Sequence, residues 1–262
     1  MTDDPLLLID VTDRVGTITL NRPERRNALN SDLMGELHYA VGDMADNKDV
    51  KVVVLTGAAP EGGLGGFCSG GDVRGGAPGP GFQLGLPPDA LEGDLARHDV
   101  HASMRLHMMP KPTIAMIGGP AVGAGASLAA ACDLRFASED AVIAMNFTPN
   151  GITGDYGGSF LWTSIVGTAL TRRLFLLNEK IPAAEALRLG MVHEVRPPAE
   201  LRDYTYAIAS QLARTPAPVL ALLKDNLNHA EEDVARRRWL LAHETDNQRE
   251  AVRAMKKLAQ DS

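Results

Sequence analysis

The 262-residue chain has little cysteine, no excess of basic charge and no long hydrophobic run. Its two cysteines, Cys68 and Cys132, are not part of a C-x-x-C pair, so they imply neither a disulfide framework nor a zinc site and fit a reducing compartment. The formal net charge is −7 and there is no basic stripe, so we expect no nucleic-acid partner. No apolar run reaches the roughly 18 residues of a membrane helix, and the acidic start lacks a signal-peptide core. We therefore expect a cytoplasmic protein with no membrane partner.

The remaining composition is that of a globular α/β protein. Its length suits one large domain with an appendage. Short β-rich runs alternate with helical segments up to residue 197, which predicts an α/β core over 1–197. The polar helical segments that follow predict a helical part over 198–262. The expected strands are 6–11, 15–20, 51–56, 113–117, 134–137, 141–146 and 192–195, the first two forming a hairpin. The expected helices are 33–44, 94–108, 121–131, 157–166, 169–177 and 182–189. Residues 75–93, rich in Gly and Pro, form either a mobile loop beside a pocket or an ordinary surface connection.

Two glycine-rich turns, Phe67–Val73 and Gly118–Ser127, each follow a run that is typical of a buried strand. Glycine allows the backbone to approach a ligand or another backbone segment closely. Turns that leave adjacent strands can each direct an amide N–H at one point, and such a pair stabilises a developing oxyanion. The alternative is two ordinary connections with tight helix packing, and spacing alone favours that alternative.

Other motifs have competing interpretations. Gly66-Phe67-Cys68-Ser69-Gly70 has the form of a thiol nucleophile elbow with His193 as its base, although a loop separates it from the preceding strand. The glycines after residue 117 lack the dinucleotide spacing, because position 128 is leucine. His98 and His101 have metal-ligand spacing but no third ligand, so no metal site is predicted.

Asp155 lies in a glycine-rich stretch just before a predicted helix. It is either an N-cap or a carboxylate at the mouth of a pocket, where burial tunes its pKa for proton transfer. The flanking glycines are more numerous than a cap requires, so both interpretations stay open.

A series of short motifs runs in order from about residue 14 to residue 196. They occupy residues 16–24, 27–29, 55–57, 67–73, 111–115, 131–135, 137–138, 157–159 and 184–192. Together they resemble the enoyl-CoA hydratase/isomerase (crotonase) superfamily. The resemblance implies a crotonase-like spiral of ββα units with a C-terminal α-helical part that builds a homotrimer, or a dimer of trimers. It also implies an acyl-CoA thioester as ligand, with coenzyme A as part of the substrate and no tightly bound cofactor.

The same resemblance assigns roles to residues of this chain. The backbone N–H groups of Gly71 and Ala124 would form the oxyanion hole for the thioester carbonyl. Lys256 and Lys257 would reach the CoA phosphates of a neighbouring subunit. The residues that would line the CoA path or contact the thioester are Arg26, Ala28, Ser69, Gly71, Asp72, Val73 and Ala124.

The acid/base set departs from the hydratase pattern. The two places that hold glutamates in typical hydratases hold Ser127 and Phe147 here, whereas Asp155 falls where several superfamily isomerases keep a working aspartate. The resemblance therefore favours an isomerase that shifts a double bond, or opens an epoxide ring, with one carboxylate. The alternatives are a hydratase that uses Asp155 with a water held by Ser127, and a non-catalytic acyl-CoA binder.

Overall fold

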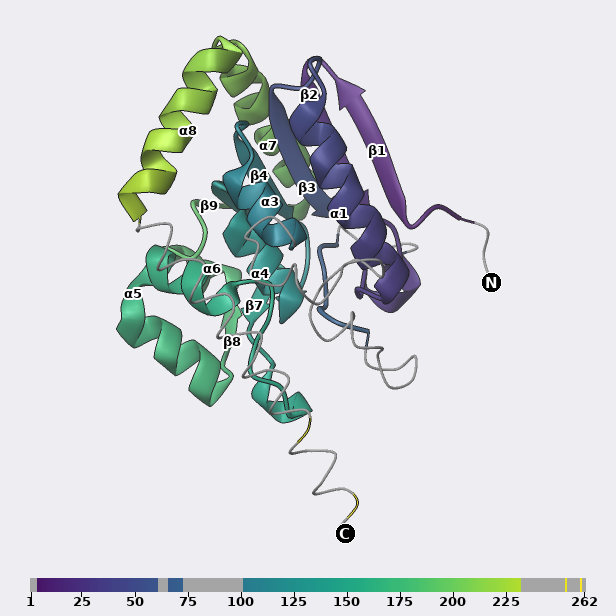
Figure 1. The fold of residues 1–262 in the computed structure, drawn as a ribbon. Helices are drawn as coiled ribbons and strands as arrows, with labels where there is room; N and C mark the ends of the chain where they lie inside the picture. The colour runs from purple at the N-terminus through teal and green to yellow at the C-terminus, as the bar shows by residue number, and fades with distance from the viewer. Residues whose placement is uncertain (1–3, 61–65, 73–100, 232–252, 254–259, 261–262) are drawn as a thin grey trace.

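The computed structural model describes residues 4–60, 66–72 and 101–231, with the single positions 253 and 260 (Figure 1). The 75–93 segment, Val73, Lys256 and Lys257 lie outside the described residues, as do residues 94–100 of a predicted helix. The described strands are β1 (Leu7–Thr12), β2 (Val15–Leu20), β3 (Val52–Gly57), β4 (Thr113–Ile117), β5 (Ala121–Val122), β6 (Leu134–Ser138), β7 (Val142–Ala144), β8 (Lys180–Pro182) and β9 (Glu194–Arg196). The described α-helices are α1 (Ser31–Asp46), α3 (Ala102–Met108), α4 (Ala124–Ala131), α5 (Gly158–Leu177), α6 (Ala183–Arg188), α7 (Pro198–Ala213) and α8 (Ala217–Glu231).

The strands form two sheets. The larger has the order β1-β2-β3-β4-β6-β9, in which only the predicted β1–β2 hairpin is antiparallel. The smaller has the order β5-β7-β8. Successive units send one strand to each sheet, as β4 and β5 do before α4, and β6 and β7 do before α5. This alternation confirms the mixed α/β spiral that the sequence predicted.

Strands β2, β3 and β4 of the large sheet are buried on both faces, which explains why β3 and β4 are nearly continuous apolar runs, whereas the edge strand β1 is mostly exposed. Successive side chains of a strand point to opposite faces, so Val53 and Leu55 of β3 belong to one core cluster and Val52 and Val54 to another. The first cluster extends to α1, α3, α4 and α5, and the second lies beneath α7. Although α7 follows residue 197, it therefore packs directly on the core sheet.

Local capping explains where α1 begins. The side chain of Asn30 accepts a hydrogen bond from the Leu33 N–H at 3.0 Å, which satisfies one of the amides that the first helical turn leaves without an intrahelical partner. Leu33, Leu37 and Val41 then bury one face of the helix at helical spacing.

Two predicted boundaries were wrong. Residues 121–122 are not the start of a helix but strand β5, because they pair with β7, which lies more than twenty residues further along the chain. The helices predicted over 157–166 and 169–177 form one element, α5, which changes direction at Gly167 (φ +78°).

As one element, α5 reaches the length and mean hydropathy of a membrane span, contrary to the expectation from the sequence. Phe160, Leu161 and Trp162 of its first turns are nevertheless buried in the main core, as in the core helix of a globular domain.

The last described helix, α8, is attached by a narrow stripe. Only Leu220, Lys224 and Asn228 among its described side chains are buried. The Lys224 Nζ atom donates to the main-chain oxygens of residues 106 and 111 at 3.1 and 3.0 Å and pairs with the Asp133 carboxylate at 2.8 Å. These bonds fix α8 against the end of α3, at the upper left of Figure 1.

Candidate active site

The first glycine turn lies between the segment before α1 and the second glycine turn. Leu29 and Gly71 form a parallel bridge in which the Leu29 N–H donates to the Gly70 oxygen and the Asp72 N–H donates to the Leu29 oxygen, both at 2.8 Å. In this pattern the N–H of Gly71 itself points away from Leu29, since donors on a strand alternate in direction. The side of this segment that is opposite Leu29 faces the second glycine turn.

The second turn opens helix α4. Gly123 has a φ of +56°, a conformation that glycine adopts without steric cost, and its N–H donates to the Ala144 oxygen at 2.9 Å. Ala124 then holds the first position of the helix, where an amide has no acceptor within the helix itself. Its N–H is therefore available to a ligand oxygen in the way that helix N-termini bind anions.

The two turns are in van der Waals contact. A Cβ atom on Gly70 would lie 2.7 Å from the Val122 oxygen and 3.6 Å from the Ala124 nitrogen. A Cβ atom on Gly125 would lie 2.2 Å from the Cys68 oxygen. Glycine at both positions is thus what permits the two backbones, about fifty residues apart in sequence, to meet.

A groove of about 600 Å³ opens beside this contact. This volume lies within the usual range for ligand-binding clefts. Five residues that the sequence predicted for the CoA path line it, namely Arg26, Ala28, Ser69, Gly71 and Asp72. Ala124 is buried behind them, next to Val122, which also lines the groove.

An ion-pair cluster shapes one wall of the groove. Asp72 pairs with Arg22 at 3.0 Å and with Arg25 at 2.8 Å, and Arg22 also donates to the Ala28 oxygen. The side chain of Asp72 is only 7% exposed, so these contacts hold the turn that carries Gly71 against the loop before α1. Lys180 of β8 and Arg26 also line the groove and contribute further cations to it.

Ser127 and Asp155 connect α4 to the turn before α5. The Ser127 hydroxyl is fully buried and donates to the main-chain oxygen of Asp155 at 3.2 Å, with the Gly123 oxygen at 3.4 Å. A Cβ atom on Gly158 would lie 2.3 Å from the same hydroxyl. Ser127 therefore contacts protein on both sides and positions the turn that carries Asp155.

The Asp155 carboxylate faces the same region. Its Oδ1 atom is shielded from solvent. Its charge also helps to raise the pKa values of Cys68 and Tyr156, although burial is the main cause in both cases. Asp155 thus places one carboxylate close to the residues that carry the two glycine turns.

Comparisons with known proteins identify the family and the fold. The family described as Enoyl-CoA hydratase/isomerase matches residues 10–257. The chain belongs to the enoyl-CoA hydratase/isomerase family. It is 31% identical over 225 residues to a short-chain-enoyl-CoA hydratase of Clostridium acetobutylicum, covering 85% of this chain and 80% of that protein. It is 34% identical over 228 residues to a 1,2-epoxyphenylacetyl-CoA isomerase of Escherichia coli, covering 86% and 82% of the two chains. The crystal structure of an enoyl-CoA hydratase from Mycobacterium avium subsp. paratuberculosis superimposes with a TM-score of 0.80 at 30% identity, covering 96% and 95%.

The thiol nucleophile interpretation is wrong for this family member. Cys68 is fully buried, and burial raises the pKa of its thiol to about 12, so the reactive thiolate does not form near neutral pH. His193, its suggested base, instead accepts a hydrogen bond from the Arg135 N–H at 3.1 Å through Nδ1.

His101, one member of the His98–His101 pair with metal-ligand spacing, is a buried residue. His101 is 3% exposed, and its ring meets the Tyr156 ring edge-on at 5.9 Å. His98 lies outside the described residues. Within the ranges that the structure describes, no three metal-ligating side chains come together.

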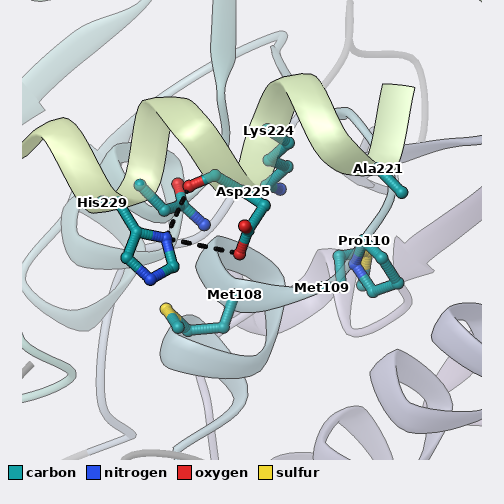
Figure 2. A pocket seen from close by; sticks show the side chains of 8 residues that line it. Met108, Met109, Pro110, Ala221, Lys224, Asp225 and His229 are labelled. Carbon is teal, nitrogen blue, oxygen red and sulfur yellow. Dashed lines mark hydrogen bonds and ion pairs between the residues drawn. The ribbon is translucent and has the colours of Figure 1, made fainter. Parts of the chain in front are cut away.

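A second hollow, of about 70 Å³, lies between α8 and the segment after α3 (Figure 2). Asp225 and His229 face one another there, with the His229 Nδ1 atom 3.4 Å from the Asp225 carboxylate. The hollow is too small for an acyl-CoA thioester. The groove beside the glycine turns is the candidate site of this family enzyme, because residues predicted for the CoA path line it.

Sequence reasoning missed several groove residues, among them Lys180 and Asn146. Asn146 has a φ of +51° at the end of β7, and the Asn150 side chain donates to its main-chain oxygen at 2.8 Å. No local motif identifies them, because the pairing of β7 with β8 brings them to the groove.

Proposed function

We propose that this member of the enoyl-CoA hydratase/isomerase family is an enoyl-CoA isomerase in which Asp155 moves a proton between carbons of the acyl chain. The thioester carbonyl would accept hydrogen bonds from the N–H groups of Gly71 and Ala124, which stabilise the enolate that forms when a proton leaves the α-carbon. The carboxylate would then return the proton to the γ-carbon, so one group serves as base and then as acid.

The observation that carries the proposal is the position of Asp155. It is linked to the first turn of α4 through the Ser127 hydroxyl, and its Oδ1 atom is shielded from solvent. The residues at the two hydratase glutamate positions, Ser127 and Phe147, are 0% and 3% exposed, and neither carries a carboxylate. One acid near the two amides supports proton transfer between carbons better than it supports the addition of water.

The CoA portion would lie along the groove. Arg26 and Lys180 are placed to attract its phosphates, while Asp72 is paired with Arg22 and Arg25 and so does not oppose them with an uncompensated charge. This arrangement supports an acyl-CoA thioester as the ligand.

Replacing Asp155 with Asn tests the catalytic role. We expect acyl-CoA binding to be retained and turnover of a 3-enoyl-CoA ester to fall by about 10²-fold or more, as is typical when a general acid/base is lost. Asp203→Asn, on the exposed side of α7, is the matched control and should leave turnover unchanged. Unchanged turnover in Asp155→Asn would refute the role.

The second candidate function is hydration, because one similar protein is a short-chain-enoyl-CoA hydratase. It would require Ser127 to hold a water, although its buried hydroxyl already contacts main-chain oxygens. Incubation with a 2-enoyl-CoA ester separates the two functions, since a hydratase converts it to the 3-hydroxy ester whereas an isomerase does not.

We also propose a homotrimer, alone or paired into a hexamer, in the cytoplasm. Exposed leucine and valine side chains on α8 support an interface between copies of the chain. They are Val219, Leu222, Leu223 and Leu227. Light scattering after gel filtration measures the mass directly, and a monomer of 28.0 kDa would contradict the proposal.

A further inference from the structure

Tyr156 is held in an unusual backbone conformation beside Asp155. Its φ is +55°, in the left-handed region that non-glycine residues rarely adopt, and Gly154 and Gly157 on either side also have positive φ. The Ser103 hydroxyl donates to its main-chain oxygen at 2.8 Å, which fixes the turn against α3. The chain therefore directs the phenol inward, where it is 1% exposed.

The phenol hydroxyl has no hydrogen-bond partner among the residues that the structure describes. Buried tyrosine hydroxyls usually have one, because leaving such a group unsatisfied is unfavourable. A ligand that supplies an acceptor would remove this cost when it binds. The missing partner is thus a sign of a contact that forms only with a ligand.

The surroundings of the Tyr156 phenol keep its hydroxyl protonated, so that it can donate a hydrogen bond. Burial raises the pKa of Tyr156 well above 10, and the charge of Asp155 adds to this effect. The neighbouring His101 ring is neutral, since burial lowers its pKa to about 4. The hydroxyl therefore stays protonated near neutral pH.

The phenol lies near the residues that the proposed function places around the acyl chain. Tyr156 and Cys68 both lie close enough to Asp155 to interact with its charge, and Cys68 belongs to the turn that carries Gly71. With the thioester oxygen at Gly71 and Ala124, the carbons beside Asp155 are the next few of the chain. An acceptor that reaches Tyr156 would be attached to these carbons.

We propose that Tyr156 donates a hydrogen bond to an oxygen on C3 or C4 of the acyl group, so that the enzyme selects oxygen-bearing acyl-CoA esters over purely hydrocarbon ones. This inference rests on the proposed function, since it places the acyl chain in the same site. It assigns Tyr156 to substrate selection and leaves proton transfer to Asp155.

Binding measurements on matched esters test the inference without requiring turnover. Dissociation constants of butyryl-CoA, 3-hydroxybutyryl-CoA and 4-hydroxybutyryl-CoA are measured by calorimetry for the wild type, Tyr156→Phe and Tyr204→Phe. The wild type should bind at least one hydroxy ester more tightly than butyryl-CoA, and Tyr156→Phe should reduce that preference by about five- to tenfold. Tyr204→Phe removes a hydroxyl from α7, in the other core cluster, and should retain the preference.

The melting temperature distinguishes a ligand-binding role of the Tyr156 hydroxyl from a purely structural one. Since the hydroxyl has no partner in the described protein, Tyr156→Phe should melt at or above the wild-type temperature. A preference that is equal in the wild type and Tyr156→Phe, or a lower melting temperature in that variant, would overturn the inference. If no ester binds, the proposed function fails as well, whereas binding of butyryl-CoA without any preference refutes this inference alone.

Discussion

Replacing Gly125 with Ala should separate the two glycine turns. The new Cβ atom would lie 2.2 Å from the Cys68 oxygen and 2.8 Å from the Cys68 Cβ atom, both shorter than the 3.0 Å below which Cβ contacts essentially do not occur. The Cys68 oxygen accepts from the Val122 N–H at 2.9 Å, so it is part of the backbone pairing and cannot rotate aside. One turn must therefore move by about 0.8 Å or more.

This displacement has two measurable consequences. Overpacking of a rigid site typically lowers the free energy of unfolding by about 1–3 kcal/mol, so the denaturant midpoint should fall. A shift of about 1 Å in a catalytic constellation can cost about 10²-fold in rate, comparable with losing one oxyanion donor. We expect kcat for a 3-enoyl-CoA ester to fall by about 10²-fold, with a smaller change in KM.

Gly42→Ala is the control for the glycine substitution itself. A Cβ at that position of α1 would lie 2.5 Å from Nη1 of Arg105, so the hydrogen bond of this atom to the His38 oxygen would have to shift, while alanine favours a helix over glycine by about 1 kcal/mol. Activity should be unchanged, and these opposing effects should leave stability close to that of the wild type. If Gly125→Ala folded with wild-type stability and turnover, the close approach of the two turns would not be what the site requires.

Two further predictions concern buried groups near the site. Cys68→Ala should retain turnover within about twofold, because a thiol with a pKa of about 12 is not the nucleophile; a loss of more than tenfold would restore the thiol interpretation. Burial, and to a lesser extent His38, lowers the pKa of His101 from 6.5 to about 4. As the pH falls, the imidazole is therefore protonated in the unfolded chain before it is protonated in the folded one. The neutral His101 ring makes its full contribution to the free energy of unfolding above pH 6.5. This contribution is lost as the pH falls toward 4, and its upper limit is about 3 kcal/mol. His101→Gln should reduce the difference between urea midpoints at pH 7 and pH 4.5, and an undiminished difference would contradict this assignment.

Local sequence signals identified much of the fold and part of the groove. Asn30 marks the start of α1 because capping depends on neighbouring residues, and the glycine turns are visible because a close backbone approach excludes side chains. The order of motifs then connected Gly71 and Asp72 to the groove that both residues line. These features depend on short stretches of chain.

The features that were missed depend on distant pairing. Strand β5 is too short to be recognised without its partner β7, and Lys180 reaches the groove only through the second sheet. The bond between Lys224 and Asp133 joins residues 91 positions apart, with no motif at either end. The unpartnered hydroxyl of Tyr156 likewise becomes evident only once its surroundings are packed.

The attachment of α8 has a consequence for how the protein opens. Two of its three buried residues, Lys224 and Asn228, hold it through directional bonds to main-chain oxygens, and water can replace these bonds once the helix lifts. Such a segment exchanges its amide hydrogens through local opening, ahead of global unfolding. In a lone subunit we expect deuterium to enter α8 well before β3 and β4, whereas burial of α8 between copies in the proposed trimer should slow that exchange. Helix α8 of a lone subunit would then behave as a separately detachable unit, whose release leaves the groove assembled.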